Sequence, residues 1–374
     1  MNISITGDTG EMAKIGRQIV AEKSGYYTPQ ALGRIRGQVR LRLPGRSEEE
    51  IEETLFRTIY FYWAYGCDVD EYFYYYFAEK SHDQIKTYVT KREKVIYTNL
   101  LNNIDDAHYL QNKYETYQLF RDAYKREMIL CDGEDCVDAF LQFVKKHPVF
   151  VVKALHLGGG QGVHKDDVLG LTEDEIRARF HALLEEVSVI NGQLNSWGSK
   201  SGFAVEELIE QGEEIGRLHP QSVNVVRMPT LLLDGEIRVY QPWLKIGCGD
   251  SFVDNGHTGG LMAGIDVRTG VVDTTGYSEL PALFEYHPDT GLRIPGTVIP
   301  AWDELVATVK ALSSRLPTIR YIAWDMAWTK KGWAVMEGNF RGAFMWQFFR
   351  GKGMKAEFEE MTGLKLEKEF WWQK

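Results

Sequence analysis

The sequence predicts a mixed α+β protein in which an α-rich N-terminal region precedes a region of alternating strands and helices. Two observations support this class. Apolar residues recur at helical spacing through much of residues 47–125. Beyond about residue 150, short apolar stretches are separated by helical segments and glycine-containing turns. The clearest strand pattern is a hairpin close to the C-terminal end, at residues 322–337.

Composition narrows the class of protein further. The chain has 374 residues, which is enough for two or three domains, and a formal net charge of −10. The acidic balance argues against a nucleic-acid partner. We expect neither export nor a membrane span, because the N-terminus has no apolar signal core and no apolar stretch reaches about 18 residues. The spacing of the four cysteines fits no zinc pattern, and reduced thiols in a cytoplasmic protein are expected.

The first third of the chain is expected to be helical and to lie outside the chemical centre. Ser47 and Glu50 have the form of a capping box, which predicts a helix over residues 47–63. Asp68 is a candidate cap for a following helix that is rich in aromatic residues. Five arginines between residues 34 and 46 are expected in a solvated strand or loop, with a phosphate-bearing partner as the alternative.

The middle of the chain begins the pattern that carries chemistry. Lys113 stands at the start of a predicted helix, and residues 134–146 form another that Pro148 ends. Residues 150–155 form a strand with Lys153 at its centre, and a lysine in an apolar strand is costly unless it meets an anion. A glycine-rich loop follows at residues 158–162, where backbone N–H groups can approach phosphates. This loop matches neither a Walker A loop nor a dinucleotide fingerprint.

Further along, charged residues recur at strand ends. Thr172 caps a predicted helix over residues 172–190, and the strand at 203–207 ends in Glu206 and Glu207. Arg227 lies in an apolar strand at 222–233, and an Asp-Gly turn leads to a partner strand at 236–246 that ends near Lys245. The next glycine-rich loop is a candidate substrate lid. It contains Asp254, Asn255, His257, Gly259 and Gly260.

The hairpin at residues 322–337 has its turn at residues 329–332. One strand presents Asp325, and the other presents Glu337 and Asn339, which share a face because side chains two apart point the same way. Folded together, these three oxygen ligands suit Mg²⁺. The alternative is a β-hairpin that carries ordinary surface acids.

The order of these motifs resembles the ATP-grasp superfamily and, more narrowly, the sugar-transfer-associated ATP-grasp family. The narrower resemblance lies in residues 220–227 (PQSVNVVR) and 253–266 (VDNGHTGGLMAGID), and the whole covers about residues 60–360. Where the family has Pro-Gly after the metal-binding asparagine, this chain has residues 340–343 (FRGA). The contact of that loop with phosphate or acceptor therefore stays open.

The resemblance implies an ATP-grasp fold, two α+β subdomains that grip ATP, with ATP and Mg²⁺ as cofactors. It divides the chain into an α-rich N-terminal region (1–105), an N-lobe with a glycine-rich flap (106–205) and a C-lobe with the metal-binding hairpin (206–374). The implied nucleotide-binding residues are Lys113, Lys153, Gly158, Gly159, Gly160, Gln161, Gly162, Glu206, Glu207, Leu208, Ile209 and Glu213. The implied catalytic residues are Arg227, Lys245 and Arg341, and the metal ligands are Asp325, Glu337 and Asn339.

Three functions are consistent with these features. The favoured one is an ADP-forming carboxylate–amine ligase that works through an acylphosphate, and the family setting in polysaccharide biosynthesis suggests a sugar-linked or glycan-precursor substrate. A kinase acting on a sugar or polyol hydroxyl would have the same ATP half. A non-catalytic nucleotide-binding module is the third alternative. The sequence does not identify the small-molecule substrates or the oligomeric state.

Overall fold

The computed structural model describes residues 3–156, 162–194, 202–252, 254, 259–280 and 282–366. The chain divides into two compact units, which are described separately here. Unit 1 comprises Met1–Leu101, Thr274–Phe284 and Ala343–Lys374, and unit 2 comprises Asn102–Asp273 and Glu285–Gly342. The three-part division expected from the sequence stays a prediction. Within the described residues, no helix combines the length and the apolarity that crossing a bilayer requires.

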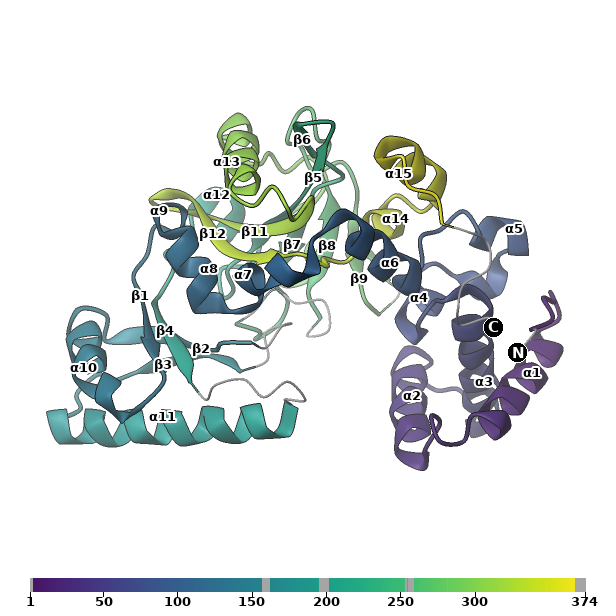
Figure 1. Cartoon of the computed structure of the whole chain (residues 1–374), viewed down its shortest axis with the longest axis horizontal. Coiled ribbons are helices and arrows are strands. Elements are labelled where there is room, and N and C mark those ends of the chain that lie inside the picture. Colours follow the sequence, from purple (N-terminus) through teal and green to yellow (C-terminus); the bar gives the residue numbers. More distant parts are fainter. Residues whose placement is uncertain are drawn as a thin grey trace. The chain divides into compact units, whose positions relative to one another are not determined.

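Unit 1 is mainly helical, as predicted for the N-terminal region (Figure 1). Its elements are α1 (Thr9–Glu22), α2 (Pro29–Arg42), α3 (Glu48–Tyr65), α4 (Val69–Tyr74), η1 (Phe77–Glu79), α5 (His82–Ile85), α6 (Lys91–Leu101), β9 (Gly276–Ser278), β10 (Ala282–Phe284), α14 (Trp346–Phe349) and α15 (Lys355–Thr362). The capping box of Ser47 and Glu50 opens α3, and Asp68 caps α4, so both cap predictions are confirmed. Helices α1 and α3 pack closely at Gly16, where a Cβ atom would lie 2.0 Å from the Phe56 carbonyl oxygen.

The prediction of a strand or loop for the arginine run is wrong, because residues 29–42 form α2. The Thr28 side chain accepts a hydrogen bond from the Ala31 N–H, and Pro29 occupies the first helical position, where its missing N–H costs nothing. Arg40 pairs with Glu48 at 2.7 Å. Ion pairs to acidic residues of unit 1 therefore take up several of the charges that a phosphate-bearing partner would need.

Unit 2 contains two sheets and the helices that cover them. Its helices are η2 (Ile104–Ala107), α7 (His108–Gln111), α8 (Lys113–Leu119), α9 (Arg121–Tyr124), η3 (Glu134–Cys136), α10 (Val137–Lys146), α11 (Glu173–Leu194), α12 (Glu213–Gly216) and α13 (Trp302–Ser314). Its strands are β1 (Met128–Cys131), β2 (Val149–Ala154), β3 (Val163–Asp167), β4 (Phe203–Glu207), β5 (Val225–Leu233), β6 (Glu236–Val239), β7 (Trp243–Ile246), β8 (Leu261–Gly264), β11 (Tyr321–Thr329) and β12 (Gly332–Asn339).

The first sheet of unit 2 is antiparallel, with the strand order β1-β4-β2-β3. Helices α10 and α11 cover one of its faces (Figure 1). Side chains alternate along β2, so Phe150 and Val152 enter the core beneath these helices while Lys153 points to the opposite face. This alternation places a charged face of the sheet opposite the second sheet.

The second sheet of unit 2 contains the neighbouring strands β8-β7-β5-β11-β12, and β6 also pairs with β5. The predicted hairpin is confirmed as β11 and β12, joined at residues 329–332. The prediction of one continuous strand over residues 236–246 is wrong, because β6 and β7 are separate. Gln241 has φ 47°, a left-handed conformation, and Pro242 has no N–H to continue the ladder.

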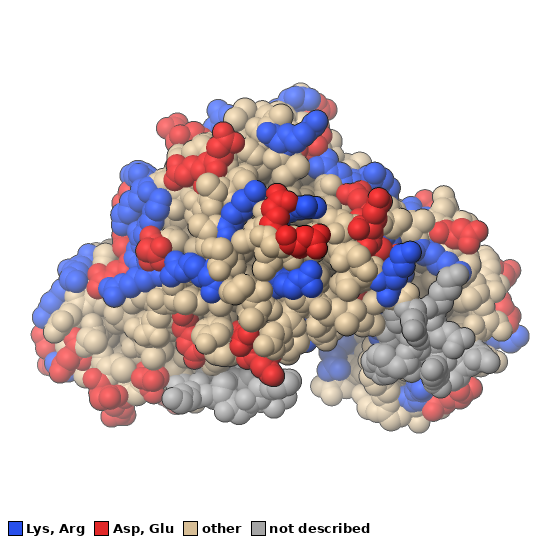
Figure 2. Space-filling view, turned by 45° about the horizontal axis from the view of Figure 1, so that its top comes forward, with Lys and Arg blue, Asp and Glu red and all other residues tan. Residues whose placement is uncertain are grey.

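The surface carries both signs of charge. On the face drawn in Figure 2, acidic and basic side chains are interspersed across the described residues. Many of them form exposed ion pairs, such as Arg177 with Glu173 at 3.0 Å and Lys330 with Glu210 at 2.7 Å. Exposed pairs of this kind stabilise a fold by about 0–1 kcal/mol each, so they contribute little compared with the buried charges of unit 2.

Candidate active site

Unit 2 contains a pocket of about 820 Å³ bounded by residues of both sheets. Its lining combines apolar side chains with a set of buried charges, which is typical of a small-molecule site. Residues that the sequence predicted account for nine of the lining positions: Lys113, Lys153, Glu206, Leu208, Ile209, Lys245, Asp254, Asp325 and Glu337. The remaining lining residues are Val151, Val163, Val223, Val225, Phe252 and Met336.

The wall formed by the first sheet carries a buried charge cluster. Lys153 on β2 lies 2.6 Å from Oε1 of Glu206 on β4, and Arg126 lies 3.0 Å from Oε2 of the same carboxylate. Arg126 also donates to the Val335 carbonyl oxygen at 2.6 Å, which links this wall to β12. Removing one member of such a cluster typically costs about 3–5 kcal/mol, because the remaining buried charge loses its partner.

Lys113 joins this wall from α8. Asn112 caps the helix by accepting hydrogen bonds from the Tyr114 and Glu115 N–H groups, so Lys113 begins the helix as predicted. Its ammonium group donates to the Ala154 carbonyl oxygen at 3.0 Å, at the end of β2. The strand lysine and the helix lysine are thereby brought to the same end of β2.

The surroundings of Lys113 and Lys153 favour the binding of an anion, because both ammonium groups are buried. Burial lowers the pKa of Lys113 to about 8; Glu337 opposes this shift and Lys153 adds to it. Burial and the nearby Arg126 also lower the pKa of Lys153, against the pull of Glu206. Burial alone would raise the pKa of Glu206, but Arg126 and Lys153 hold it below its usual value. The carboxylate therefore stays ionised, and the wall has more cations than anions.

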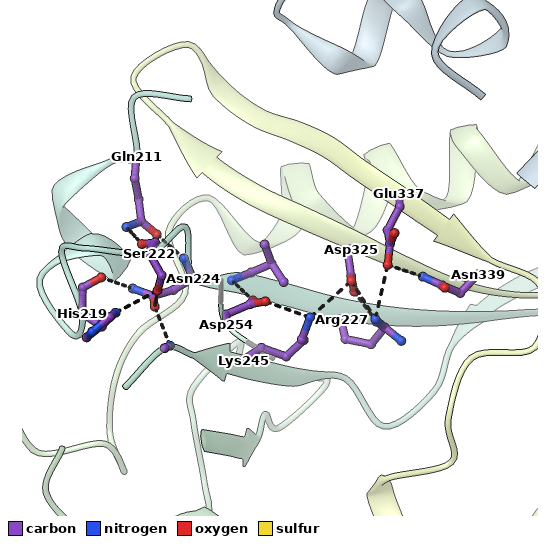
Figure 3. A network of polar contacts seen from close by, with 12 residues as sticks. Gln211, His219, Ser222, Asn224, Arg227, Lys245, Asp254, Asp325, Glu337 and Asn339 are labelled. Atoms are coloured by element: carbon purple, nitrogen blue, oxygen red, sulfur yellow. Dashed lines mark hydrogen bonds and ion pairs between the residues drawn. The ribbon is translucent and has the colours of Figure 1, made fainter. Parts of the chain in front are cut away.

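The wall formed by the second sheet is organised by strand register. Asp325 on β11 is directly opposite Glu337 on β12 and, on its other side, directly opposite Arg227 on β5. The Arg227 guanidinium makes a bidentate contact with Asp325, with Nη2 at 2.6 Å from Oδ2, and lies 3.9 Å from Glu337. Figure 3 shows the side chains of Asp325 and Glu337 directed toward this arginine.

Lys245 on β7 extends the cluster. It lies 3.0 Å from Asp254 and 3.5 Å from Asp325, and Asp254 also accepts a hydrogen bond from the Val225 N–H at 3.2 Å (Figure 3). Burial would raise the pKa of Asp325, but Arg227 and Lys245 lower it below its usual value. Burial raises the pKa of Asp254, and Lys245 only partly offsets this. Among the predicted lid residues, Asp254 is thus a buried member of the cluster.

Asn339 lies beside the two hairpin acids. Its Nδ2 donates to Oε1 of Glu337 at 3.1 Å, from the position opposite Ala323. The Glu337 side chain is 39% exposed, whereas that of Asp325 is 4% exposed. One hairpin acid is therefore held by cations inside the protein, and the other is open to a ligand.

Other predicted residues lie outside the pocket lining. Glu207 pairs with Lys331 at 2.8 Å and borders a neighbouring cavity of about 450 Å³, while Glu213 borders a third cavity of about 1090 Å³. Gly162 accepts a hydrogen bond from the Ala154 N–H at 2.9 Å, at the base of the predicted flap. Among the described residues, Arg341, Gly259 and Gly260 border none of these three cavities. Gly158, Gly159, Gly160, Gln161, Asn255 and His257 lie outside the described residues.

Sequence reasoning missed Arg126 and a polar network behind the second wall. Arg126 follows Lys125, which has φ 52°, and nothing in the local sequence separates it from a surface arginine. The network centres on Asn224, whose amide group bonds the Ile215 and His219 carbonyl oxygens at 3.2 Å each and the Gly247 N–H at 3.1 Å. Gln211 completes it, accepting from the Asn224 N–H at 2.6 Å. The polar residues of PQSVNVVR were the available signal.

A family model described as sugar-transfer associated ATP-grasp matches residues 92–362. The chain belongs to this family. It therefore has an ATP-grasp fold, of mixed α+β class, with a helical N-terminal region. The resemblance predicted from the motifs is confirmed. No curated protein matches the chain significantly.

Solved structures similar to this ATP-grasp chain are distant in sequence. D-alanyl-alanine synthetase A from Vibrio cholerae has 12% identity and a TM-score of 0.39, over 71% of this chain and 63% of that one. D-alanine-D-alanine ligase from Coxiella burnetii has 10% identity and a TM-score of 0.41, over 72% and 63%. Phosphoribosylamine–glycine ligase from Thermotoga maritima has 13% identity and a TM-score of 0.43, over 74% and 61%. The chain thus spans less than two thirds of each of these proteins.

Proposed function

We propose that this ATP-grasp protein is an ATP- and Mg²⁺-dependent carboxylate–amine ligase that acts through an acylphosphate. The observation that carries the proposal is the pairing of two unlike walls around one pocket. Lysines gather on one wall, and the hairpin acids Asp325 and Glu337 stand on the other. Phosphoryl transfer from ATP needs that combination, because catalysis depends on positioning and charge neutralisation more than on a protein nucleophile.

The residues present fit magnesium. Asp325, Glu337 and Asn339 offer two carboxylates and an amide oxygen, the hard donors that Mg²⁺ takes together with phosphate oxygens. The exposed position of Glu337 leaves it available, while Arg227 and Lys245 keep Asp325 ionised. A bound magnesium ion would neutralise charge on the phosphates and lower the barrier to transfer.

The pocket suggests a place for each part of ATP. Lys113 and Lys153 would contact the α- and β-phosphates, and the apolar side chains beyond them would contact adenine, with Leu208 and Ile209 at the strand end. Arg227 and Lys245 would face the γ-phosphate from the opposite wall. The glycine-rich flap and Glu213 keep the roles that the family resemblance implies, as parts of this proposal.

The proposed chemistry has two steps. A substrate carboxylate oxygen attacks the γ-phosphorus, the bond to the β-phosphate oxygen breaks, and ADP leaves. An amine then attacks the acylphosphate carbonyl carbon, phosphate leaves, and the amine gives up a proton to form the amide. Arg227 and Lys245 would stabilise the charge that develops on the transferred phosphoryl group. The family description, which refers to sugar transfer, supports a sugar-linked substrate. A glycan precursor in polysaccharide biosynthesis is the form of that substrate that we propose.

The test is an assay of the whole chain with Mg²⁺ and ATP against paired sugar acids, amino acids, amino sugars and sugar nucleotides. Free phosphate and product mass are read together. We expect ADP, free phosphate and a product equal to both substrates minus water. If the phosphoryl group instead stays on a sugar hydroxyl, the protein is a kinase and not a ligase. ATP binding without any turnover across the panel would count against catalysis and favour a binding module.

A variant pair controls the assay. Glu337→Gln should lose most of its turnover, because it replaces a charged metal ligand by a neutral one of the same shape. Asp234→Asn, in the exposed turn between β5 and β6, should retain it, because that carboxylate lies outside the pocket lining. Equal turnover in Glu337→Gln and the wild type would refute the metal assignment.

A further inference from the structure

A second cluster of metal-ligating side chains lies on the far side of the polar network from the ATP pocket. Ligand atoms of Cys248, His287 and Asp289 all lie within 4.8 Å of one another. His219 adds a fourth donor, with its Nε2 atom 3.8 Å from Oδ2 of Asp289. These residues come from three separate segments of unit 2: the turn after α12, the loop after β7 and the turn after β10.

From this geometry we propose a zinc-type site that holds the loop after β7 in place. Its ligands are Cys248, His287, Asp289 and His219. The site is separate from the magnesium ligands of the proposed ligase and does not depend on that activity. A thiolate, two imidazoles and a carboxylate are the donors that Zn²⁺ takes in proteins, usually four at a time and in tetrahedral arrangement. Oxygen-preferring cations such as Mg²⁺ do not select such a set.

Two of the donor separations are close to the edges of a tetrahedron around one ion. With metal–sulfur and metal–nitrogen bonds of about 2.3 and 2.0 Å, two donors on one tetrahedral ion lie about 3.5 Å apart. Cys248 Sγ and His287 Nε2 are 3.5 Å apart. The corresponding nitrogen–oxygen edge is about 3.3 Å, and the 3.8 Å between His219 Nε2 and Asp289 Oδ2 is somewhat longer, so metal binding requires these two side chains to move closer together. The two imidazole centroids are 5.6 Å apart, so both rings can face one ion.

The second nitrogen of His219 has the partner that a metal-bound histidine requires. Its Nδ1 is 2.8 Å from Ser222 Oγ, and the Ser222 hydroxyl donates to Asn224 Oδ1 at 3.2 Å. A hydroxyl has one proton. When the Ser222 hydroxyl donates to Asn224, Nδ1 of His219 is the donor to Ser222 and the lone pair of Nε2 is left for a metal, so this is the tautomer that a metal would select. Outer partners of this kind fix the tautomer of metal-ligating histidines (Figure 3).

The remaining contacts define what a metal would replace. His287 Nε2 lies 2.7 Å from the Gly247 carbonyl oxygen, and His219 Nε2 lies 2.9 Å from that of Gly249. In the metal-free protein each Nε2 donates to its carbonyl oxygen, and each Nδ1 then accepts, from the Ser222 hydroxyl in His219 and from the Asp289 N–H at 3.3 Å in His287. Metal binding at Nε2 exchanges these hydrogen bonds for two metal–nitrogen bonds and moves the imidazole proton to Nδ1. Asp289 can keep its bond from the Gly249 N–H at 2.6 Å, because a carboxylate has further lone pairs.

The position of this site links it to the ATP pocket. The loop that begins at Gly247 follows β7, which carries Lys245, and leads to Asp254; both charged residues belong to the buried cluster of the second wall. Gly247 has no room for a side chain, since a Cβ atom would lie 2.2 Å from Ser222 Oγ. A metal ion at this point would fix the loop between the two residues and hold Lys245 and Asp254 in register.

The experiment is a Co²⁺ titration of the whole chain, followed by metal analysis of zinc-loaded, dialysed protein. We expect one tightly bound equivalent with the near-ultraviolet thiolate-to-cobalt band and the strong visible bands of tetrahedral Co²⁺. Cys248→Ser should lose the thiolate band, and Asp289→Ala, at a half-exposed position, should weaken binding at least tenfold while the protein stays folded. Ser222→Ala should weaken binding by about tenfold through the outer partner.

Matched variants separate this site from others. Cys136→Ser removes the other partly exposed thiol and should leave the spectrum unchanged. Glu337→Gln should also keep the thiolate band, because oxygen ligands at the ATP site give none. The proposal is overturned if wild-type protein shows no thiolate band. It is equally overturned if Cys248→Ser, or Asp289→Ala with an unchanged melting temperature, binds Co²⁺ with wild-type affinity and spectrum.

Discussion

The two walls of the proposed ATP pocket carry buried charges in opposite proportions. Among the described residues, the first wall has three cations, Lys113, Lys153 and Arg126, and one carboxylate, that of Glu206. On the second sheet, Arg227 and Lys245 face three carboxylates, those of Asp254, Asp325 and Glu337. The first wall therefore has an excess of positive charge, and the second has an excess of negative charge.

Under the proposed function, this difference would let one pocket accept a polyphosphate and a divalent cation together. The first wall would attract phosphate directly, because its carboxylate, Glu206, is already shared by two cations. The second wall repels phosphate until a cation joins it, so its contribution should depend on Mg²⁺. Variants on the first wall are expected to change nucleotide affinity, and variants on the second wall to change the magnesium requirement.

The largest effect is expected for Asp325→Asn. The change leaves Arg227 and Lys245 buried beside a neutral amide, so the free energy of unfolding should fall by about 3 kcal/mol. Turnover should fall about 10³-fold, since both metal binding and the placement of Arg227 are lost. Thermal unfolding and the phosphate-release assay measure the two effects. Turnover within tenfold of wild type would contradict a central role for this carboxylate.

Glu337→Gln should separate metal binding from stability. Because the Glu337 side chain is partly exposed and pairs with Arg227 only at 3.9 Å, stability should change by less than about 0.5 kcal/mol. Turnover should fall about 10²-fold, and the Mg²⁺ concentration at half-maximal rate should rise. A magnesium titration at saturating ATP is the measurement. If the magnesium requirement is unchanged, Glu337 is not a metal ligand, and the two walls differ less in function than proposed.

Lys153→Ala tests the first wall alone. Loss of a charge-assisted contact to phosphate should weaken ATP binding by about 10- to 100-fold. The magnesium concentration at half-maximal rate should stay the same, because the hairpin ligands are untouched. Calorimetric binding of ATP at fixed Mg²⁺ measures the first quantity, and melting temperature checks that Arg126 alone still holds Glu206. ATP affinity equal to that of wild type would refute the phosphate role.

The parts of this site that the sequence predicted are those encoded within one element or one hairpin. Asp325 and Glu337 belong to one hairpin, so the sequence places them on neighbouring strands. An unbroken register would pair Asp325 with Met336, and a β-bulge between Asp325 and Met326 brings Glu337 opposite it instead.

Lys153 is predicted as a binding residue because a lysine in an apolar strand requires an anion. The structure adds that Glu206 already forms an ion pair with it. The predicted helix start at Lys113 is confirmed, and the structure adds that Asn112 caps this helix.

What the sequence did not predict depends on contacts between distant segments. Arg126 reaches Glu206 because β1 and β4 are neighbours, and the strand order β1-β4-β2-β3 is not written in any local pattern. Cys248 and His287 are also brought together only by the fold. They are 39 residues apart, and the spacing of the cysteines fits no zinc pattern. The arginine-rich segment forms helix α2. Its start is encoded locally by Thr28 and Pro29, whereas the spacing of its charges alone does not indicate a helix.

The smallest expected effect is a pH dependence that belongs to the first wall. Lys113 has a pKa of about 8 because it is buried, so it is charged below pH 8 and loses its proton as the pH rises through that value. A phosphate ligand favours the charged form, so ATP affinity should fall by about three- to tenfold between pH 7 and pH 9. Lys113→Arg, which stays charged throughout, should flatten this profile. Binding measured by calorimetry at fixed ionic strength tests it, and a profile equally steep in both proteins would assign the dependence to a group other than Lys113.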